Sequence, residues 1–124
     1  MKDRPCPFCD YNELNNETWF TAWEPFPIGV GHIKLMPYRH DATLFTLTEQ
    51  EQADFFELLG RTKVYIDSSM GEHKPDGYNL GVNCGEAAGQ TIQHLHVHLI
   101  PRYQGDVENP RGGVRNIKPA LVSW

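Results

Sequence analysis

The alternation of apolar and polar residues marks four extended segments, which are residues 17–24, 32–36, 77–84 and 91–100. The first is rich in aromatic residues and threonine, as strands are, and the second ends at Pro37. The last two alternate apolar side chains with polar or small ones, and residues 91–100 do so most regularly. All four segments are therefore predicted to be β-strands.

A helix is predicted between the second and third strands. Thr48 and Glu51 have the spacing of a capping box, in which each residue satisfies a free backbone N–H group of the other. Apolar residues then recur at helical spacing along one face, and Gly71 is a typical residue just past a helix end. The helix is expected to run to about Ser69.

Strands in adjacent pairs beside one long helix predict an α+β fold with an antiparallel sheet. The 124 residues suit one domain, so we expect residues 1–124 to form a single domain. Residues 1–16 are expected to form an N-terminal arm, which carries Cys6-Pro-Phe-Cys9, and residues 103–124 a C-terminal tail of little periodicity.

Composition narrows the classes of partner. The formal charge of −5 argues against a general nucleic-acid binder, which needs a strongly basic surface, but it leaves room for a small phosphate ligand. The chain has no apolar run near the ~18 residues of a membrane helix, and its first residues do not resemble a signal peptide. With three cysteines, an odd number, we expect a reduced, cytoplasmic protein without membrane contact.

The strongest chemical signal is a row of histidines in the last predicted strand. In an extended segment His94, His96 and His98 share one face, with about 6.5 Å between neighbours, while the alternate Leu and Val residues share the other. The apolar face suits the core, whereas the histidine face has no packing role. It fits a metal site, phosphoryl or nucleotidyl transfer through a covalent histidine, or a merely solvated surface.

The residues around this row favour a phosphate ligand. Small residues at positions 85–89 allow backbone N–H groups to approach an anion closely. Asn83, Gln90 and Thr91 add polar side chains next to the row, without an apolar role of their own. We therefore expect these three residues to contact substrate phosphate.

The stretch AGQTIQHLHVHLIPR resembles the signature of the histidine triad (HIT) family. The similarity extends to Gly31-His32, to residues 37–40 and 76–79, and to the tail around residues 105–115, which is similar to that of a bacterial branch. This resemblance implies a five-stranded antiparallel sheet with one long and one short helix. It also implies a homodimer in which two subunits extend the sheet.

The resemblance further implies a nucleotidyl hydrolase or transferase that acts on the α-phosphate of dinucleoside polyphosphates. His96 would attack phosphorus, with His98 and His94 as the other catalytic histidines and no metal needed for the chemistry. A neutral nucleophile requires that its other nitrogen keep its proton in a hydrogen bond, for which a backbone carbonyl is suited. Phosphoramidate hydrolysis, phosphorolysis, nucleotide binding with little turnover, and a metal-dependent enzyme remain as alternatives.

The resemblance also assigns residues outside the row. Glu24 lies eight residues before His32, where family members hold the ribose hydroxyls, although Asp is more usual there. His32 is expected either near the nucleoside or as a structural hydrogen-bonding residue. In some relatives the matching residues bind zinc. The resemblance thus implies that Cys6, Cys9, His40 and His94 form a structural zinc site with closed tetrahedral ligation. A zinc-bound His94 would not be free to protonate the leaving group.

Overall fold

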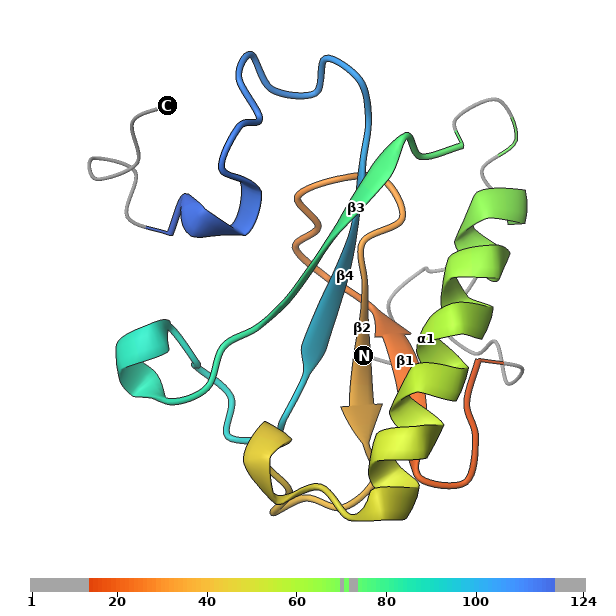
Figure 1. Cartoon of the computed structure of the whole chain (residues 1–124), viewed down its shortest axis with the longest axis vertical. Coiled ribbons are helices and arrows are strands. Elements are labelled where there is room, and N and C mark those ends of the chain that lie inside the picture. Colours follow the sequence, from red (N-terminus) through yellow and green to blue (C-terminus); the bar gives the residue numbers. More distant parts are fainter. Residues whose placement is uncertain (1–13, 70, 72–73, 118–124) are drawn as a thin grey trace.

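The computed structural model describes residues 14–69, 71 and 74–117. Four strands form one antiparallel sheet in the order β1-β2-β4-β3, beside one long helix (Figure 1). The strands are β1 (Trp19–Trp23), β2 (Ile33–Pro37), β3 (Gly77–Val82) and β4 (Val97–Arg102), and the helix is α1 (Glu49–Ser69). Short 3₁₀ turns form η1 (Leu44–Thr46), η3 (Glu86–Ala88) and η4 (Gly113–Arg115). The predicted α+β class is confirmed.

Helix α1 begins as its capping box predicts. The Thr48 backbone N–H donates to Glu51 Oε1 over 2.9 Å, and the Glu51 N–H donates to Thr48 Oγ1 over 3.0 Å. Arg39 adds two hydrogen bonds to the same carboxylate, of 3.0 and 2.8 Å, and these lower the pKa of Glu51 to about 2. The buried indole of Trp19 donates to the Glu51 carbonyl over 2.8 Å, which fixes the start of the helix against β1.

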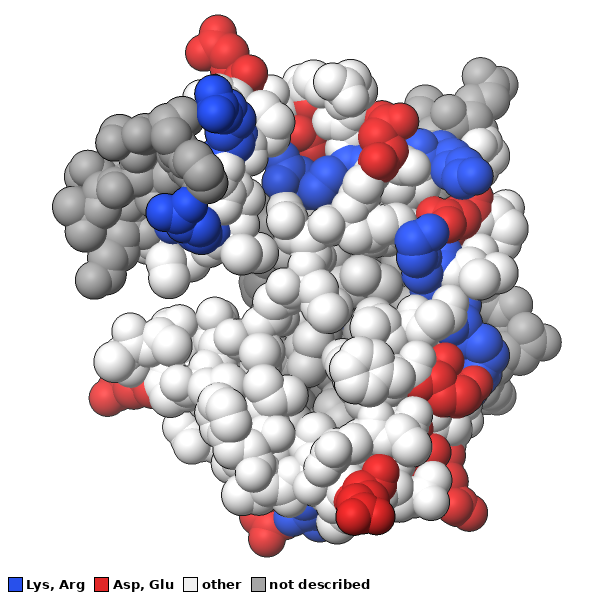
Figure 2. All heavy atoms as spheres, in the orientation of Figure 1, with Lys and Arg blue, Asp and Glu red and all other residues white. Residues whose placement is uncertain are grey.

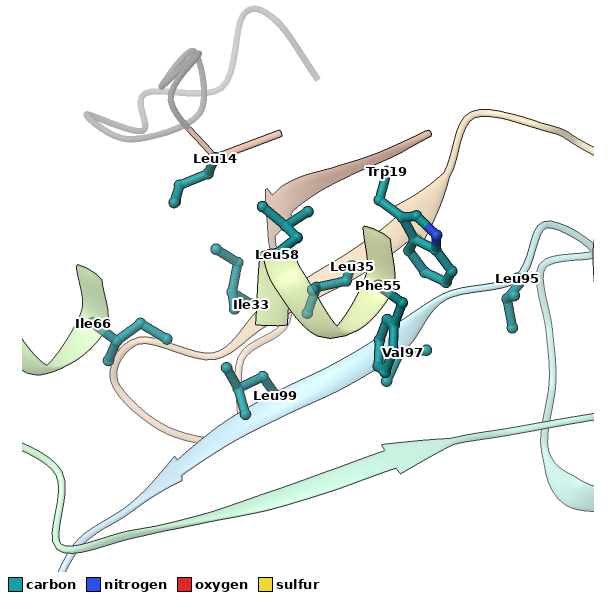
Figure 3. Close-up of a cluster of buried hydrophobic side chains, with 10 residues drawn as sticks. All are labelled: Leu14, Trp19, Ile33, Leu35, Phe55, Leu58, Ile66, Leu95, Val97 and Leu99. Carbon is teal, nitrogen blue, oxygen red and sulfur yellow. The ribbon is translucent and has the colours of Figure 1, made fainter. Parts of the chain in front are cut away.

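The core lies between α1 and one face of the sheet. Figure 3 shows apolar side chains from the helix, from β1, β2 and β4, and from the flanking segments meeting in one cluster. Leu95, Val97 and Leu99 enter this core, while the three alternate histidines are only half-buried. The predicted division of this segment into an apolar and a histidine face is therefore present.

The boundaries of the last strand differ from the prediction of residues 91–100. Strand β4 begins only at Val97, because both β2 and β3 pair with it from residue 97 onward and no strand of the described residues pairs with residues 91–96. It continues through Pro101, where β3 is the one paired neighbour, since pairing with β2 ends at Leu99. A proline, which lacks the N–H group, is tolerated where a strand has a paired neighbour on one side only.

The fifth strand and the short helix implied by the family resemblance are not found within residues 14–69, 71 and 74–117. An isolated antiparallel bridge between Asn15 and Phe20 is the nearest feature to an added strand. Residues 1–13 of the predicted N-terminal arm lie outside the described residues. In the described part of the chain, no helix combines the length and apolar character needed to cross a membrane.

Candidate active site

His96 has the hydrogen bond that a nucleophilic imidazole requires. Its Nδ1 lies 2.8 Å from the backbone carbonyl oxygen of His94, which can only accept. Nδ1 therefore carries the ring proton, and Nε2 keeps its lone pair. The half-buried ring lies with its centroid 5.2 Å from that of His98, so the two imidazoles form one pair at the start of β4.

His98 is fixed by a chain of hydrogen bonds that starts at a backbone amide. The Ile28 N–H donates to His32 Nδ1 over 3.2 Å, so the second nitrogen of a neutral His32 carries the proton. That nitrogen, Nε2, lies 2.9 Å from His98 Nδ1 and donates to it. A neutral His98 must then carry its own proton on Nε2, where it is a hydrogen-bond donor.

The two imidazole rings in this series of hydrogen bonds, those of His32 and His98, are held neutral near pH 7. Burial lowers the pKa of His32, and neighbouring His98 lowers it further. Burial likewise lowers the pKa of His98, with a smaller contribution in the same direction from His96. Only 4% of His32 is exposed, and its two ring nitrogens contact the Ile28 N–H and His98.

A cavity of about 860 Å³ joins the predicted nucleoside residues to this histidine chain. Glu24, His32, Asn83 and His98 line it together with apolar side chains, and His96 lies beside it. Glu24 Oε1 is 3.8 Å from His98 Nδ1 and 3.9 Å from the Lys34 ammonium. The cavity therefore has a polar part next to the histidines and an apolar part, a division typical of small-molecule sites.

His94 belongs to a different cluster from His96 and His98. Its Nε2 donates to the Pro37 carbonyl over 2.6 Å, and its Nδ1 lies 3.2 Å from Nδ1 of His40. The two rings meet edge to face with centroids 5.1 Å apart. Both nitrogens of His94 are thus directed at protein groups, so its ring is not directed at the same ligand as His96.

The polar residues before the row have different positions from one another. Gln90 closes the glycine loop, because its Oε1 accepts from the Gly85 N–H over 2.8 Å and its Nε2 donates to the Ile92 carbonyl over 2.9 Å. Asn83 and Thr91 are both exposed, but only Asn83 is among the residues that line the cavity. Of these three predicted phosphate contacts, Asn83 is the one that lines the cavity with His32 and His98.

Two groups of residues offer metal ligands. Glu24, His32 and His98 each present a ligand atom, and these atoms lie within 4.8 Å of one another. A metal there would need the Nε2 lone pair of His32, yet the Ile28 N–H already makes Nε2 the protonated nitrogen. We therefore assign this group to hydrogen bonding. The second group is His40 with His94, while Cys6 and Cys9 lie outside the described residues.

Sequence reasoning missed the backbone groups that set these tautomers. The Ile28 N–H and the Pro37 carbonyl each hold one histidine of the site, and backbone groups leave no signal in the choice of residue. It also missed the apolar lining of the cavity from Phe26 and Ile28. Two exposed apolar residues in a Pro-rich loop were the available signal for that wall.

Comparisons with known proteins agree with this geometry. A family model described as HIT domain matches residues 14–105. A Mycobacterium tuberculosis protein named AP-4-A phosphorylase is 39% identical over 110 residues, which cover 81% of this chain and 55% of that protein. A Saccharomyces cerevisiae protein named bis(5'-adenosyl)-triphosphatase is 37% identical over 79 residues, which cover 63% of this chain and 37% of that protein. The matches thus span only about half or less of these relatives.

Solved structures show the same fold. A HIT family protein from Bacillus anthracis superposes with a TM-score of 0.66 and 29% identity, covering 82% of this chain and 76% of that one. A zinc-bound histidine triad family protein from Mycobacterium smegmatis gives a TM-score of 0.60 and 29% identity, covering 74% and 65%.

Proposed function

Because the chain belongs to the HIT family, we propose that it is a nucleotidyl hydrolase or transferase that acts on the α-phosphate of dinucleoside polyphosphates. The names of the mycobacterial and yeast relatives, a phosphorylase and a triphosphatase of adenosine polyphosphates, support this substrate class. The observation that carries the proposal is the His96 Nδ1 hydrogen bond to the His94 carbonyl, which leaves Nε2 as a nucleophile.

The reaction proceeds in two displacements at one phosphorus atom. His96 Nε2 forms a bond to the α-phosphorus while the bond to the bridging oxygen breaks, and the remaining nucleotide leaves. Water then attacks the nucleotidyl-histidine, which releases a nucleoside monophosphate and restores the imidazole. Inorganic phosphate in place of water gives phosphorolysis with the same intermediate.

His98 is suited to stabilise the charge that develops on the phosphoryl oxygens. Its Nε2–H is a fixed donor, because His32 occupies the other nitrogen and burial disfavours a charged ring. His94 is a poor source of the leaving-group proton, since its nitrogens are directed at Pro37 and His40. A neutral His98 would become an imidazolate if it gave up its Nε2 proton, so we assign the leaving-group proton to water.

The nucleoside is proposed to lie in the cavity beside His98. The Glu24 carboxylate lines this cavity and is suited to accept hydrogen bonds from the two ribose hydroxyls. Asn83 lines the same cavity and supplies an amide donor for a phosphate oxygen. For Thr91, which is exposed in the loop before the row, a phosphate contact stays a prediction.

We further propose a structural zinc site formed by Cys6, Cys9, His40 and His94. Two imidazole nitrogens bound at about 2.0–2.1 Å to one tetrahedral ion lie roughly 3.3–3.4 Å apart. The Nδ1 atoms of His40 and His94 are 3.2 Å apart, and the Pro37 carbonyl holds the other nitrogen of His94 as it would in a ligated ring. The zinc-bound relative from M. smegmatis supports this proposal.

A homodimer and a cytoplasmic location complete the proposal. Strand β3 lies at an edge of the sheet, where a second copy has backbone groups available for pairing. Leu80 of this strand is 42% exposed, which adds an apolar side chain to that region. The proposed substrates are nucleotides, and the free thiol of Cys84 suits a reducing compartment. The division into one domain with arm and tail stays a prediction.

A substrate panel tests the activity. Diadenosine tri- and tetraphosphate, adenosine phosphoramidate and adenylylsulfate are incubated with the protein, with and without inorganic phosphate. We expect release of AMP from the diadenosine polyphosphates. Faster turnover of the phosphoramidate would favour that alternative class, phosphate-dependent ADP formation would identify a phosphorylase, and nucleotide binding without turnover would contradict the enzymatic proposal.

Trapping the intermediate tests the nucleophile. The reaction is stopped during turnover by rapid denaturation at alkaline pH, and the peptides are analysed by mass spectrometry. We expect a nucleotide adduct on His96. The His96→Asn variant is expected to lose both the adduct and activity, and the matched His94→Asn variant to keep the adduct. An adduct on another residue, or full activity of His96→Asn, would refute the mechanism. Chelator that abolishes chemistry without unfolding the protein would favour the metal-dependent class.

A further inference from the structure

Two segments far apart in sequence expose apolar side chains to the same cavity. Phe26 and Ile28 precede β2 and are 84% and 75% exposed, while Val114 and Ile117 lie in the C-terminal tail and are 57% and 82% exposed. All four line the cavity of about 860 Å³ that also contains Glu24, His32 and His98. Exposed apolar groups that gather around one cavity mark a ligand site.

The tail is shaped so that it reaches this cavity. Gly112 and Gly113 have φ angles of 90° and 49°, a conformation that side-chain-bearing residues rarely adopt. An added Cβ at Gly113 would lie 3.5 Å from Asn79 Nδ2, so the tail runs in van der Waals contact with β3. Figure 2 shows the surface hollowed between the tail and the turn η3, and Val114, Ala87 and Ala88 all line the cavity there.

Hydrogen bonds fix the start of the tail against the rest of the site. The Tyr103 hydroxyl donates to the Val30 carbonyl over 2.8 Å, which ties the tail to the loop that carries Phe26 and Ile28. Arg102 donates to Asn79 over 2.6 Å and to both carboxylate oxygens of Asp106 over 2.8 and 3.0 Å. The guanidinium of Arg102 is thus engaged within the protein, and it anchors the tail to β3.

We propose that Val114 and Ile117 form a wall of the subsite that binds the base of the nucleotide. This inference rests on the proposed function, which places the ribose and phosphate at Glu24, Asn83 and the histidines. The base then occupies the apolar part of the same cavity, where aliphatic side chains from the tail and the aromatic ring of Phe26 contact its faces. The tail is therefore a specificity-determining segment for the nucleoside.

Binding of adenosine 5′-monophosphate and of ribose 5-phosphate separates base contacts from phosphate contacts. Val114→Ser and Ile117→Ser are compared with Val107→Ser, a matched change on the same tail that does not line this cavity. We expect each cavity variant to weaken adenosine monophosphate binding about tenfold by calorimetry, because apolar contact with the base is lost. Ribose 5-phosphate inhibition and kcat at saturating substrate are expected to stay unchanged, so that KM rises alone.

The possible outcomes each decide the question. Equal nucleotide affinity in Val114→Ser, Ile117→Ser and Val107→Ser would overturn the inference while leaving the wild-type activity and the proposed function intact. An equal loss of ribose 5-phosphate binding would also overturn it, since the tail would then act on the phosphate half. Wild-type protein that neither binds adenosine monophosphate nor turns over any substrate would refute the proposed function together with the inference.

Discussion

The two ends of the histidine row have the same residue and opposite surroundings. At the first end, His94 directs one nitrogen at the Pro37 carbonyl and the other at His40. At the other end, His98 has one nitrogen held by His32 and the other turned into a donor beside the cavity. The comparison teaches that spacing alone does not decide the role of a triad histidine. The partners of its two nitrogens decide whether the ring is engaged by the protein on both sides or presents a free donor beside the cavity.

The largest difference between the ends is expected in activity. His98→Ala removes a donor to the developing phosphoryl charge, and we expect kcat to fall about 100-fold to 1,000-fold. His94→Ala leaves the backbone carbonyl that holds His96, so we expect a much smaller loss of kcat and a clear loss of thermal stability. Steady-state kinetics and thermal melts of both variants measure this contrast. Equal loss of kcat in the two variants would show that His94 acts directly in the reaction.

Removal of the metal tests the His94 end of the histidine row. We expect His40→Ala and Cys6→Ser to lose one bound zinc ion per chain, measured by elemental mass spectrometry. If the site stabilises the fold by about 3 kcal/mol, the melting temperature falls by roughly 10 °C. Turnover below that temperature is expected to stay within about threefold of wild type, because no step of the proposed chemistry uses the metal. His32→Gln is the control that should keep the metal, and zinc-free wild type would contradict the site.

The hydrogen bonds from Ile28 through His32 to His98 predict a graded effect on kcat. His32→Ala removes the donor that fixes the tautomer of His98, and we expect kcat to fall about tenfold, less than on loss of His98 itself. His32→Gln keeps an amide N–H near the position of Nε2 and should recover part of kcat, whereas His32→Asn, which reaches only the position of Nδ1, should not. Identical kcat values for the three variants would mean that His32 serves the fold alone.

The smallest expected effect is a dependence of stability on pH. Burial lowers the pKa of His32 and His98 in the folded protein, so the unfolded chain binds protons more readily below about pH 6.5. The folded protein therefore has its full stability above about pH 6.5. It loses stability as the pH falls from the pKa of the unfolded histidines toward their lower pKa in the folded protein. Urea unfolding at pH 7.5 and at pH 5.5 is expected to give a steeper decline for wild type than for a His32→Gln, His98→Gln double variant. Parallel declines would contradict the shifts.

Much of the fold was open to prediction because it rests on short-range patterns. The capping box of Thr48 and Glu51 gave the start of α1, and the alternation around Val97 gave the buried and half-buried faces of the last strand. The need for a proton-holding carbonyl behind His96 followed from imidazole chemistry, and the His94 carbonyl two residues away meets it. Each of these features joins residues within a few positions of one another.

The tertiary structure decided what depends on strand pairing. His32 and His98 are 66 positions apart, and His40 and His94 are 54 apart, so their meeting depends on how β2 pairs with β4. The same applies to the start of β4 at Val97, which neighbouring strands impose on a longer alternating segment. The sequence by itself determined the row of three histidines and the face of the segment that they share. The three-dimensional arrangement determined which nitrogen of His94 and of His98 holds a proton, because the groups that decide it, the Pro37 carbonyl and the His32 ring, lie far away along the chain.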